Sequence, residues 1–145
     1  MLLYILKTIH IVGATLWFAY PLGQARALRL AASADDAYWE LTVAECLRRV
    51  RLSFVMGVLT TGAGALLIFF MYGSVGNAPS QLHGALGLVI LMLGCTLFGQ
   101  LPAVTTDPEE VVSAERRKRM ITGLARWTGV IHFLWLLTLV LMYVR

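Results

Sequence analysis

The sequence predicts an all-α fold: a polytopic membrane protein whose four transmembrane helices form an up-down-up-down bundle. The first observation is composition, since 59% of the 145 residues are hydrophobic and only 14% are charged. A soluble domain averages roughly 45–50% apolar and about 25% charged residues. The second is that the apolar residues come in four runs, each long enough to cross a bilayer as a helix. The third is that most basic residues lie between these runs. We expect a single transmembrane domain over residues 1–145.

The four predicted spans cover residues 2–25, 52–72, 81–101 and 120–143. In the first span we expect Pro21 to kink the far end, because proline removes one backbone donor. In the second, Gly57, Thr61 and Gly64 recur at helical spacing and predict a small face on which a neighbouring helix packs closely. The third span is expected to stop at Pro102.

Two polar connections predict the topology. Residues 26–51 hold five basic residues, and a capping box at Ser33 and Asp36 predicts an amphipathic helix that runs into the second span. Residues 101–119 hold four more, after a helix start at Asp107-Pro108-Glu109-Glu110. The connection at 73–80 has none. The positive-inside rule then places both basic connections in the cytoplasm and both termini outside.

Each of three predicted spans carries one histidine, namely His10, His83 and His132. A histidine inside a membrane helix is costly unless it has a partner. Each also has a glycine one turn toward the predicted cytoplasmic side, namely Gly13, Gly87 and Gly129. Because helix positions three or four apart share a face, these glycines would leave room beside the imidazoles for a bulky planar ligand. Bundle cores are common sites for such cofactors.

The histidines therefore predict a bound haem b. We expect His10 and His83 to be the iron ligands, with Gly13 and Gly87 against the macrocycle. Lys7, one turn outward of His10, is the candidate partner of a haem propionate. His132 is a further ligand or a proton relay. The second nitrogen of each ligating ring should bond a carbonyl or hydroxyl acceptor, for which the Leu6 and Pro79 carbonyls, one turn back, are candidates.

A simpler interpretation stands beside this one. A single histidine in a membrane helix can merely hydrogen-bond a backbone carbonyl or a hydroxyl of a neighbour, and glycine is frequent in such helices. The chain would then be a structural membrane subunit. Three histidines at compatible depths favour a metal or a haem over this alternative.

The segments around two histidines resemble a known family. The segment Leu6-Lys7-Thr8-Ile9-His10-Ile11-Val12, followed by Trp17-Phe18-Ala19 and Tyr20-Pro21, resembles the first helix of the HemJ-like protoporphyrinogen oxidases. It also resembles that of the related CopD-like and DUF2269-type four-helix membrane proteins. Gln81-Leu82-His83-Gly84-Ala85-Leu86 resembles the opening of their third helix. The resemblance implies a haem b protein of the bacterial inner membrane, with His10 and His83 at the family's histidine positions. Ala85 stands where the HemJ-like proteins carry a lysine, and His132 is an addition.

These observations lead us to expect an integral membrane haem b-binding redox protein, for electron transfer or as an accessory subunit of a membrane redox complex. The alternatives are a HemJ-like protoporphyrinogen IX oxidase, CopD-like copper handling, with copper in place of haem, and a structural subunit. The expected partners are the lipid bilayer, other membrane subunits or a second copy, and a quinone or a porphyrin. The net charge of +4 lies in loops that set topology and does not indicate nucleic acid.

Overall fold

The computed structural model describes residues 1–105 and 113–143, and within these ranges the chain is helical with no β-strand. The elements in chain order are α1 (Leu2–Ala19), α2 (Gln24–Ala31), α3 (Asp36–Tyr72), a short 3₁₀-helix η1 (Val75–Asn77), α4 (Ser80–Cys95), a π-helical segment η2 (Thr96–Gln100), α5 (Leu101–Val104) and α6 (Ala114–Tyr143). The predicted all-α class is confirmed for the described residues.

Four helical stretches of the described chain are long and apolar enough to cross a membrane. They cover residues 2–31, 36–72, 80–104 and 114–143. Each contains most or all of one predicted span, so the prediction of four membrane-crossing helices is confirmed at the level of length and composition. The stretches are longer than the spans, because helical structure continues into the polar connections.

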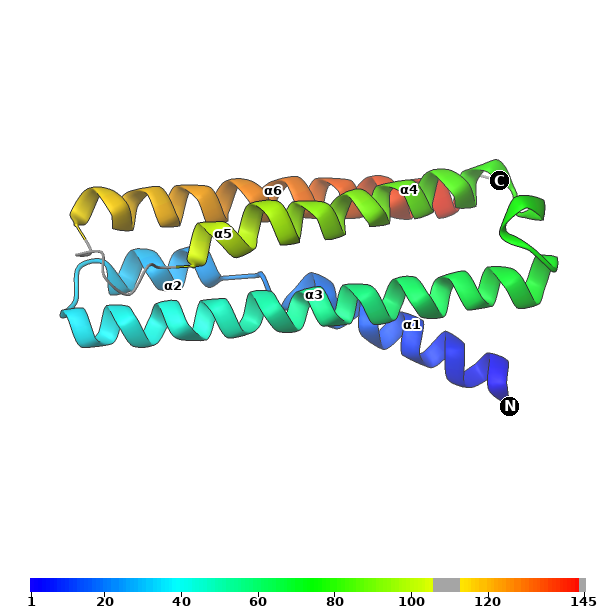
Figure 1. Cartoon of the computed structure of the whole chain (residues 1–145), viewed down its shortest axis with the longest axis horizontal. Coiled ribbons are helices and arrows are strands. Elements are labelled where there is room, and N and C mark those ends of the chain that lie inside the picture. The colour runs from blue at the N-terminus through cyan, green and yellow to red at the C-terminus, as the bar shows by residue number, and fades with distance from the viewer. Residues whose placement is uncertain (106–112, 144–145) are drawn as a thin grey trace.

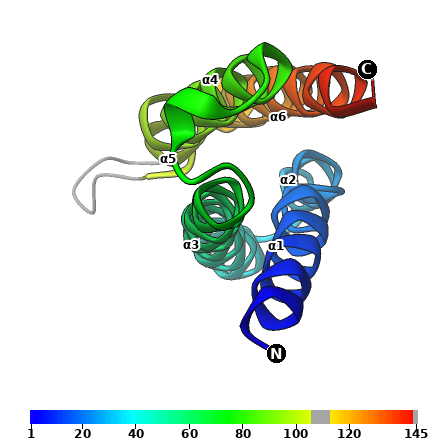
Figure 2. The same ribbon diagram turned by 90° about the vertical axis from the view of Figure 1, so that its right-hand side faces the viewer.

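The helices form two pairs, α1 with α3 and α4 with α6 (Figures 1 and 2). α2 joins the pairs near one end of the molecule, where it packs against both α3 and α6. The described parts of both polar connections lie at that end, and the N-terminus and the end of α6 lie at the opposite end (Figure 1). The arrangement is therefore up-down-up-down, as predicted.

The first span is interrupted near Pro21, where the sequence predicted a kink. α1 ends at Ala19, and α2 begins after Gly23, whose φ of 77° is left-handed. Glycine reaches this conformation without the steric penalty that a Cβ brings. The chain thus turns and resumes as α2, which buries Leu28 and Ala31 against Trp39 of α3.

The predicted capping box at the start of α3 is wrong. The cap is Asp35, whose carboxylate accepts from the backbone N–H of Tyr38 at 2.8 Å. Ser33 instead donates its hydroxyl to the Leu30 carbonyl at 3.0 Å. The predicted helix from about residue 35 nevertheless forms, and it runs without a break into the second span.

The expectation that the third span stops at Pro102 is also wrong, since helical structure continues to Val104. The π-helical segment η2 comes just before this proline. Pro102 lies near the start of α5, and its missing N–H removes one backbone hydrogen bond from the continuing helix. The predicted helix start at Asp107-Pro108-Glu109-Glu110 lies outside the described residues.

Two clusters of buried side chains hold the bundle together. One, at the end with the polar connections, is centred on Leu28, Trp39, Val50 and Leu124. The other, nearer the middle, contains Trp17, Met92, Ile131 and Leu134. Many large apolar side chains outside the clusters are exposed, among them Phe69, Phe70, Ile90, Phe98 and Phe133. Exposed apolar surface on this scale is what a bilayer-facing bundle presents.

Candidate functional site

His10 faces α3. Its Nδ1 lies 2.9 Å from the backbone oxygen of Thr60. A carbonyl oxygen only accepts, so Nδ1 carries the hydrogen and a neutral ring keeps a free lone pair on Nε2. Gly64 makes room for the ring, because a Cβ at that position would lie 3.0 Å from Cε1 of His10. The predicted small face of α3 therefore receives the imidazole directly.

Gly13 shares the face of His10 and also points at α3. It is buried, and a Cβ added there would lie 2.5 Å from Oγ1 of Thr60. Thr60 thus occupies the space that the sequence analysis assigned to a macrocycle. In this structure Gly13 serves the close approach of α1 to α3.

The His10 ring also lines a small cleft between the two helix pairs. The cleft has a volume of about 50 Å³ and is walled by α3, α4 and the end of α6. Small side chains face it from both pairs: Gly64 and Ala65 on α3, and Ala85 on α4. Its remaining lining is mostly apolar. The His10 side chain therefore borders a narrow apolar space in the predicted outer half of the bundle.

The structure does not bring His83 to this cleft. His83 is exposed, and its Nε2 lies 2.7 Å from the Val75 oxygen in η1. Gly87 shares that side of α4 and has no described atom within 4 Å of an added Cβ. Among the α4 residues that line the cleft, Ala85 lies two residues after His83 and is buried, so it points to the other side of the helix. Because a helix turns about 100° per residue, the side chains of His83 and Ala85 are about 160° apart around the helix axis.

His132 lies on α6 and faces α1. Its Nδ1 is 2.7 Å from the Thr128 oxygen, one turn back. Its Nε2 is buried and has no hydrogen-bond partner among the described residues. The ring packs edge-on against Phe18, with centroids 4.4 Å apart. His132 is thus a second buried acceptor, at the seam between α1 and α6.

The carbonyl acceptors differ from those predicted. Thr60 and Val75 accept from His10 and His83, in place of Leu6 and Pro79. Both acceptors belong to other elements, so these histidines tie α1 to α3 and α4 to η1. Lys7, the predicted propionate partner, is exposed and makes no ion pair within the described chain.

Sequence reasoning missed a buried polar pair next to His132. Gln100 is fully buried, and its Nε2 donates to Oγ1 of Thr128 at 2.9 Å. The Thr128 carbonyl in turn accepts from His132. A glutamine within an apolar span was the available signal, because a polar side chain there needs a partner.

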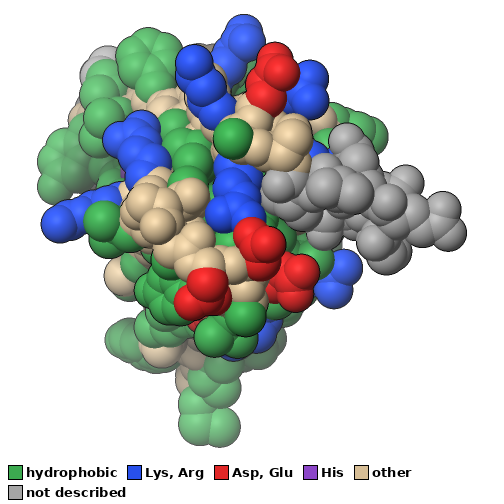
Figure 3. All heavy atoms as spheres, turned by 90° about the vertical axis from the view of Figure 1, so that its left-hand side faces the viewer, with side chains coloured by type: hydrophobic (Ala, Val, Ile, Leu, Met, Phe, Trp, Pro, Cys, Tyr) green, Lys and Arg blue, Asp and Glu red, His purple; other side chains and the backbone are tan. Residues whose placement is uncertain are grey.

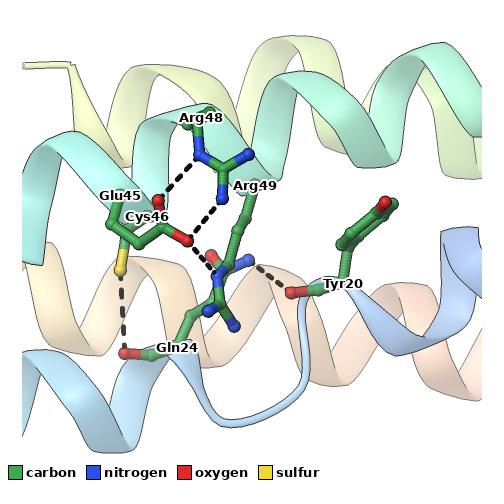
Figure 4. A network of polar contacts seen from close by, with 6 residues as sticks. All are labelled: Tyr20, Gln24, Glu45, Cys46, Arg48 and Arg49. Carbon is green, nitrogen blue, oxygen red and sulfur yellow. Dashed lines mark hydrogen bonds and ion pairs between the residues drawn. The ribbon is translucent and has the colours of Figure 1, made fainter.

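A polar network lies at the end of the bundle with the basic connections (Figure 4). Glu45 accepts from Arg48 and Arg49, both with nitrogen–oxygen distances of 2.7 Å. These two hydrogen-bonded guanidinium groups lower the pKa of the Glu45 carboxyl to about 2. Gln24 of α2 donates to the Tyr20 carbonyl at 2.6 Å, which supports the turn between α1 and α2. These contacts link residues of the α1–α2 turn and of α3 among themselves, and none of them involves a histidine.

Within the described residues, no group of three or more His, Cys, Asp or Glu side chains is placed to hold a metal ion. Comparisons with protein-family models, with curated proteins and with solved structures each found no match. The histidines, together with the resemblance of the segments around His10 and His83, are therefore the basis of the function proposed for this chain.

Proposed function

We propose that the chain is an integral membrane haem b-binding redox protein in which His10 is an iron ligand. The observation that carries this proposal is the state of the His10 ring. Its Nδ1–H is fixed on the Thr60 carbonyl, which leaves the Nε2 lone pair of a neutral ring free, and the residue lines an apolar cleft together with small side chains. Histidines that bind metals usually donate their other ring N–H to such an acceptor.

The donor chemistry fits a haem, whereas the volume fits only after a displacement. Small-molecule pockets measure roughly 300–1,000 Å³, and this cleft measures about 50 Å³. Because the cleft lies between the α1–α3 pair and the α4–α6 pair, a macrocycle would enter by separating the pairs there. The small side chains of Gly64, Ala65 and Ala85 reduce the displacement required. When bound, haem b would supply one-electron redox chemistry.

Two histidines compete for the second ligand position. His83 is the candidate that the resemblance implies, and it would have to leave Val75 and turn toward the cleft. His132 is favoured by its buried, unpartnered Nε2. If His132 is the second ligand, the haem lies at the seam between α1 and α6.

We further propose that the end with both basic connections faces the cytoplasm of a bacterial cell and that both termini lie outside. Figure 3 shows Lys and Arg side chains gathered at this end, with Asp and Glu among them. The positive-inside rule supports this orientation. The described helices support a multi-pass membrane location, and the bacterial inner membrane follows the resemblance.

The test is a set of three alanine variants, His10→Ala, His83→Ala and His132→Ala, purified in a mild detergent with reduced-minus-oxidised spectra. We expect His10→Ala to lose the b-type signal. A converted spectrum in only one of the other two variants identifies the second ligand. Full retention of the signal in His10→Ala contradicts the proposal.

The same preparations separate the alternatives. Copper without haem in a metal analysis would replace the proposal by a CopD-like one. Rescue of a strain that lacks protoporphyrinogen oxidase would extend the proposal to the HemJ-like activity. The resemblance around His10 and His83 implies this activity, whereas Ala85, in place of the family's lysine, counts against it. Neither haem nor copper would leave a structural membrane subunit.

A further inference from the structure

A second cleft lies at the end with the polar connections, between α2 and the start of α6. Its volume is about 420 Å³. Three cationic side chains line it, Arg29 from α2 and Arg117 and Lys118 from α6. Ala32, Ile121 and Thr122 also line it, Ala32 one turn after Arg29 and the other two on α6 with Arg117 and Lys118. We refer to these six residues as the basic cleft.

Arg117 is fixed in the wall of the basic cleft. Its guanidinium forms an ion pair with Asp36 and donates to the Ala32 carbonyl at 3.4 Å. It also lies 4.9 Å from the centroid of the Trp39 ring, and its side chain is only 12% exposed. A guanidinium held on several sides keeps its position, so it offers a preorganised positive charge.

Arg29 and Lys118 are available for a ligand. Both are exposed, and neither forms an ion pair or hydrogen bond within the described chain. Counting Arg29, Arg117 and Lys118 as three positive charges and Asp36 as one negative charge leaves a local charge of +2. The start of α6 also contributes the positive end of a helix dipole, which favours an anion.

The basic cleft lies at the boundary between polar and apolar sequence. Lys118 belongs to the basic run, whereas Ile121 and Thr122 open the predicted fourth span. Trp39, which is 1% exposed, lies beneath Arg117. A ligand seated here would meet cations at one end and the apolar surface of a membrane helix at the other. An anionic amphiphile matches both ends.

We propose that the basic cleft binds the headgroup of an anionic phospholipid from the leaflet on this side of the membrane. Arg29 and Lys118 contact the phosphate, Arg117 forms the charged back wall, and the acyl chains run along α6 beyond Ile121. Basic pockets between membrane helices on the cytoplasmic side are suited to anionic headgroups. The proposal is independent of haem binding.

The test uses the full chain in a mild non-ionic detergent, titrated with phosphatidylglycerol and, separately, with phosphatidylcholine, and read by native mass spectrometry. We expect phosphatidylglycerol to bind more tightly. The double variant Arg29→Gln/Lys118→Gln should weaken phosphatidylglycerol binding roughly 30-fold, because each basic residue near an anionic lipid contributes roughly fivefold. Arg29→Lys/Lys118→Arg, which keeps both charges, should retain most of the affinity.

The matched control is Arg26→Gln/Arg119→Gln, which removes the same charge from the same two helices. Arg26 and Arg119 are exposed and do not line the cleft. An equal loss in the control double variant would overturn the proposal in favour of unspecific charge. Equal binding of phosphatidylglycerol and phosphatidylcholine to the wild-type chain would also overturn the proposal, and this comparison does not depend on any variant. Complete displacement of phosphatidylglycerol by excess inorganic phosphate would reassign the cleft to a free anion.

Discussion

At the scale of single residues, the partners of the histidines lie on helices that sequence spacing cannot select. The sequence indicates that a histidine in an apolar span needs an acceptor, and all three rings bond a backbone carbonyl. Only His132 uses its own helix, at Thr128. His10 uses Thr60, fifty residues away, because Gly13 and Gly64 let α1 and α3 approach closely. Such a choice depends on helix pairing, which no local pattern encodes.

We predict that His132→Phe leaves stability unchanged or raises it in a preparation without ligand at this seam. The buried Nε2 of His132 has no described partner, and an unsatisfied buried polar atom costs about 1–3 kcal/mol. Phenylalanine keeps the ring contact with Phe18 and removes the polar atom. Thermal unfolding followed by far-ultraviolet circular dichroism in detergent measures the effect. A large loss of stability in that preparation would contradict the unpartnered state of Nε2.

At the scale of elements, the contact between the π-helical segment η2 and α6 depends on one glycine. A Cβ at Gly99 would lie 2.3 Å from the Trp127 ring, so the indole would have to move. Gly94, one turn or so earlier, has no described atom within 4 Å of its added Cβ. The sequence predicted neither the π-helical segment nor this contact, because Gly94 and Gly99 look alike in an apolar run.

We predict opposite effects for the two glycines. Gly99→Ala should lower the free energy of unfolding by about 1–3 kcal/mol through overpacking. Gly94→Ala should leave it unchanged or raise it by up to about 1 kcal/mol, since alanine favours the helix. The measurement is the melting temperature of each variant relative to the wild-type chain, in the same detergent. Equal shifts would contradict the described packing of η2 on Trp127.

The charged end of α3 gives a prediction on pH. The pKa of Glu45 is lowered from 4.5 to about 2, first by hydrogen bonds from Arg48 and Arg49. A carboxyl whose folded pKa is lowered stabilises the fold above the unfolded pKa, and the effect is lost as pH falls through the folded value. The melting temperatures of the wild-type chain and of Glu45→Gln should therefore differ by a small constant amount above about pH 5. They should converge as the pH approaches about 2, whereas a gap that persists there would be contrary to the prediction.

At the scale of the whole molecule, the four helices that are long and apolar enough to cross a membrane were predictable, and their pairing was not. Spans are visible as apolar runs, because lipid and core both select apolar side chains. For the same reason the helices lack a distinct polar face, and the pattern does not tell which side of α4 points inward. His83 and Gly87 share one face as predicted, but the structure places Ala85 and Leu86, not these two, at the cleft.

The orientation of the bundle in the membrane is a further prediction. We expect a cysteine at Gly76, in the connection between α3 and α4, to react with an impermeant thiol reagent in intact cells. A cysteine at Ser113, just before α6, should react only after the membrane is opened. Both positions are exposed, and the native Cys46 and Cys95 are replaced by serine in the background chain. Labelling of Ser113→Cys in intact cells would reverse the proposed orientation.

The central claim is that the chain holds a haem b with His10 as a ligand. The most direct measurement is the pyridine haemochrome content per chain of the full-length protein, purified from cells supplied with a haem precursor and compared with His10→Ala prepared in parallel. We predict at least one haem b per wild-type chain and close to none in His10→Ala, with both preparations equally helical. A wild-type chain that is folded and carries no haem, or a His10→Ala chain that carries as much as the wild type, would contradict the account.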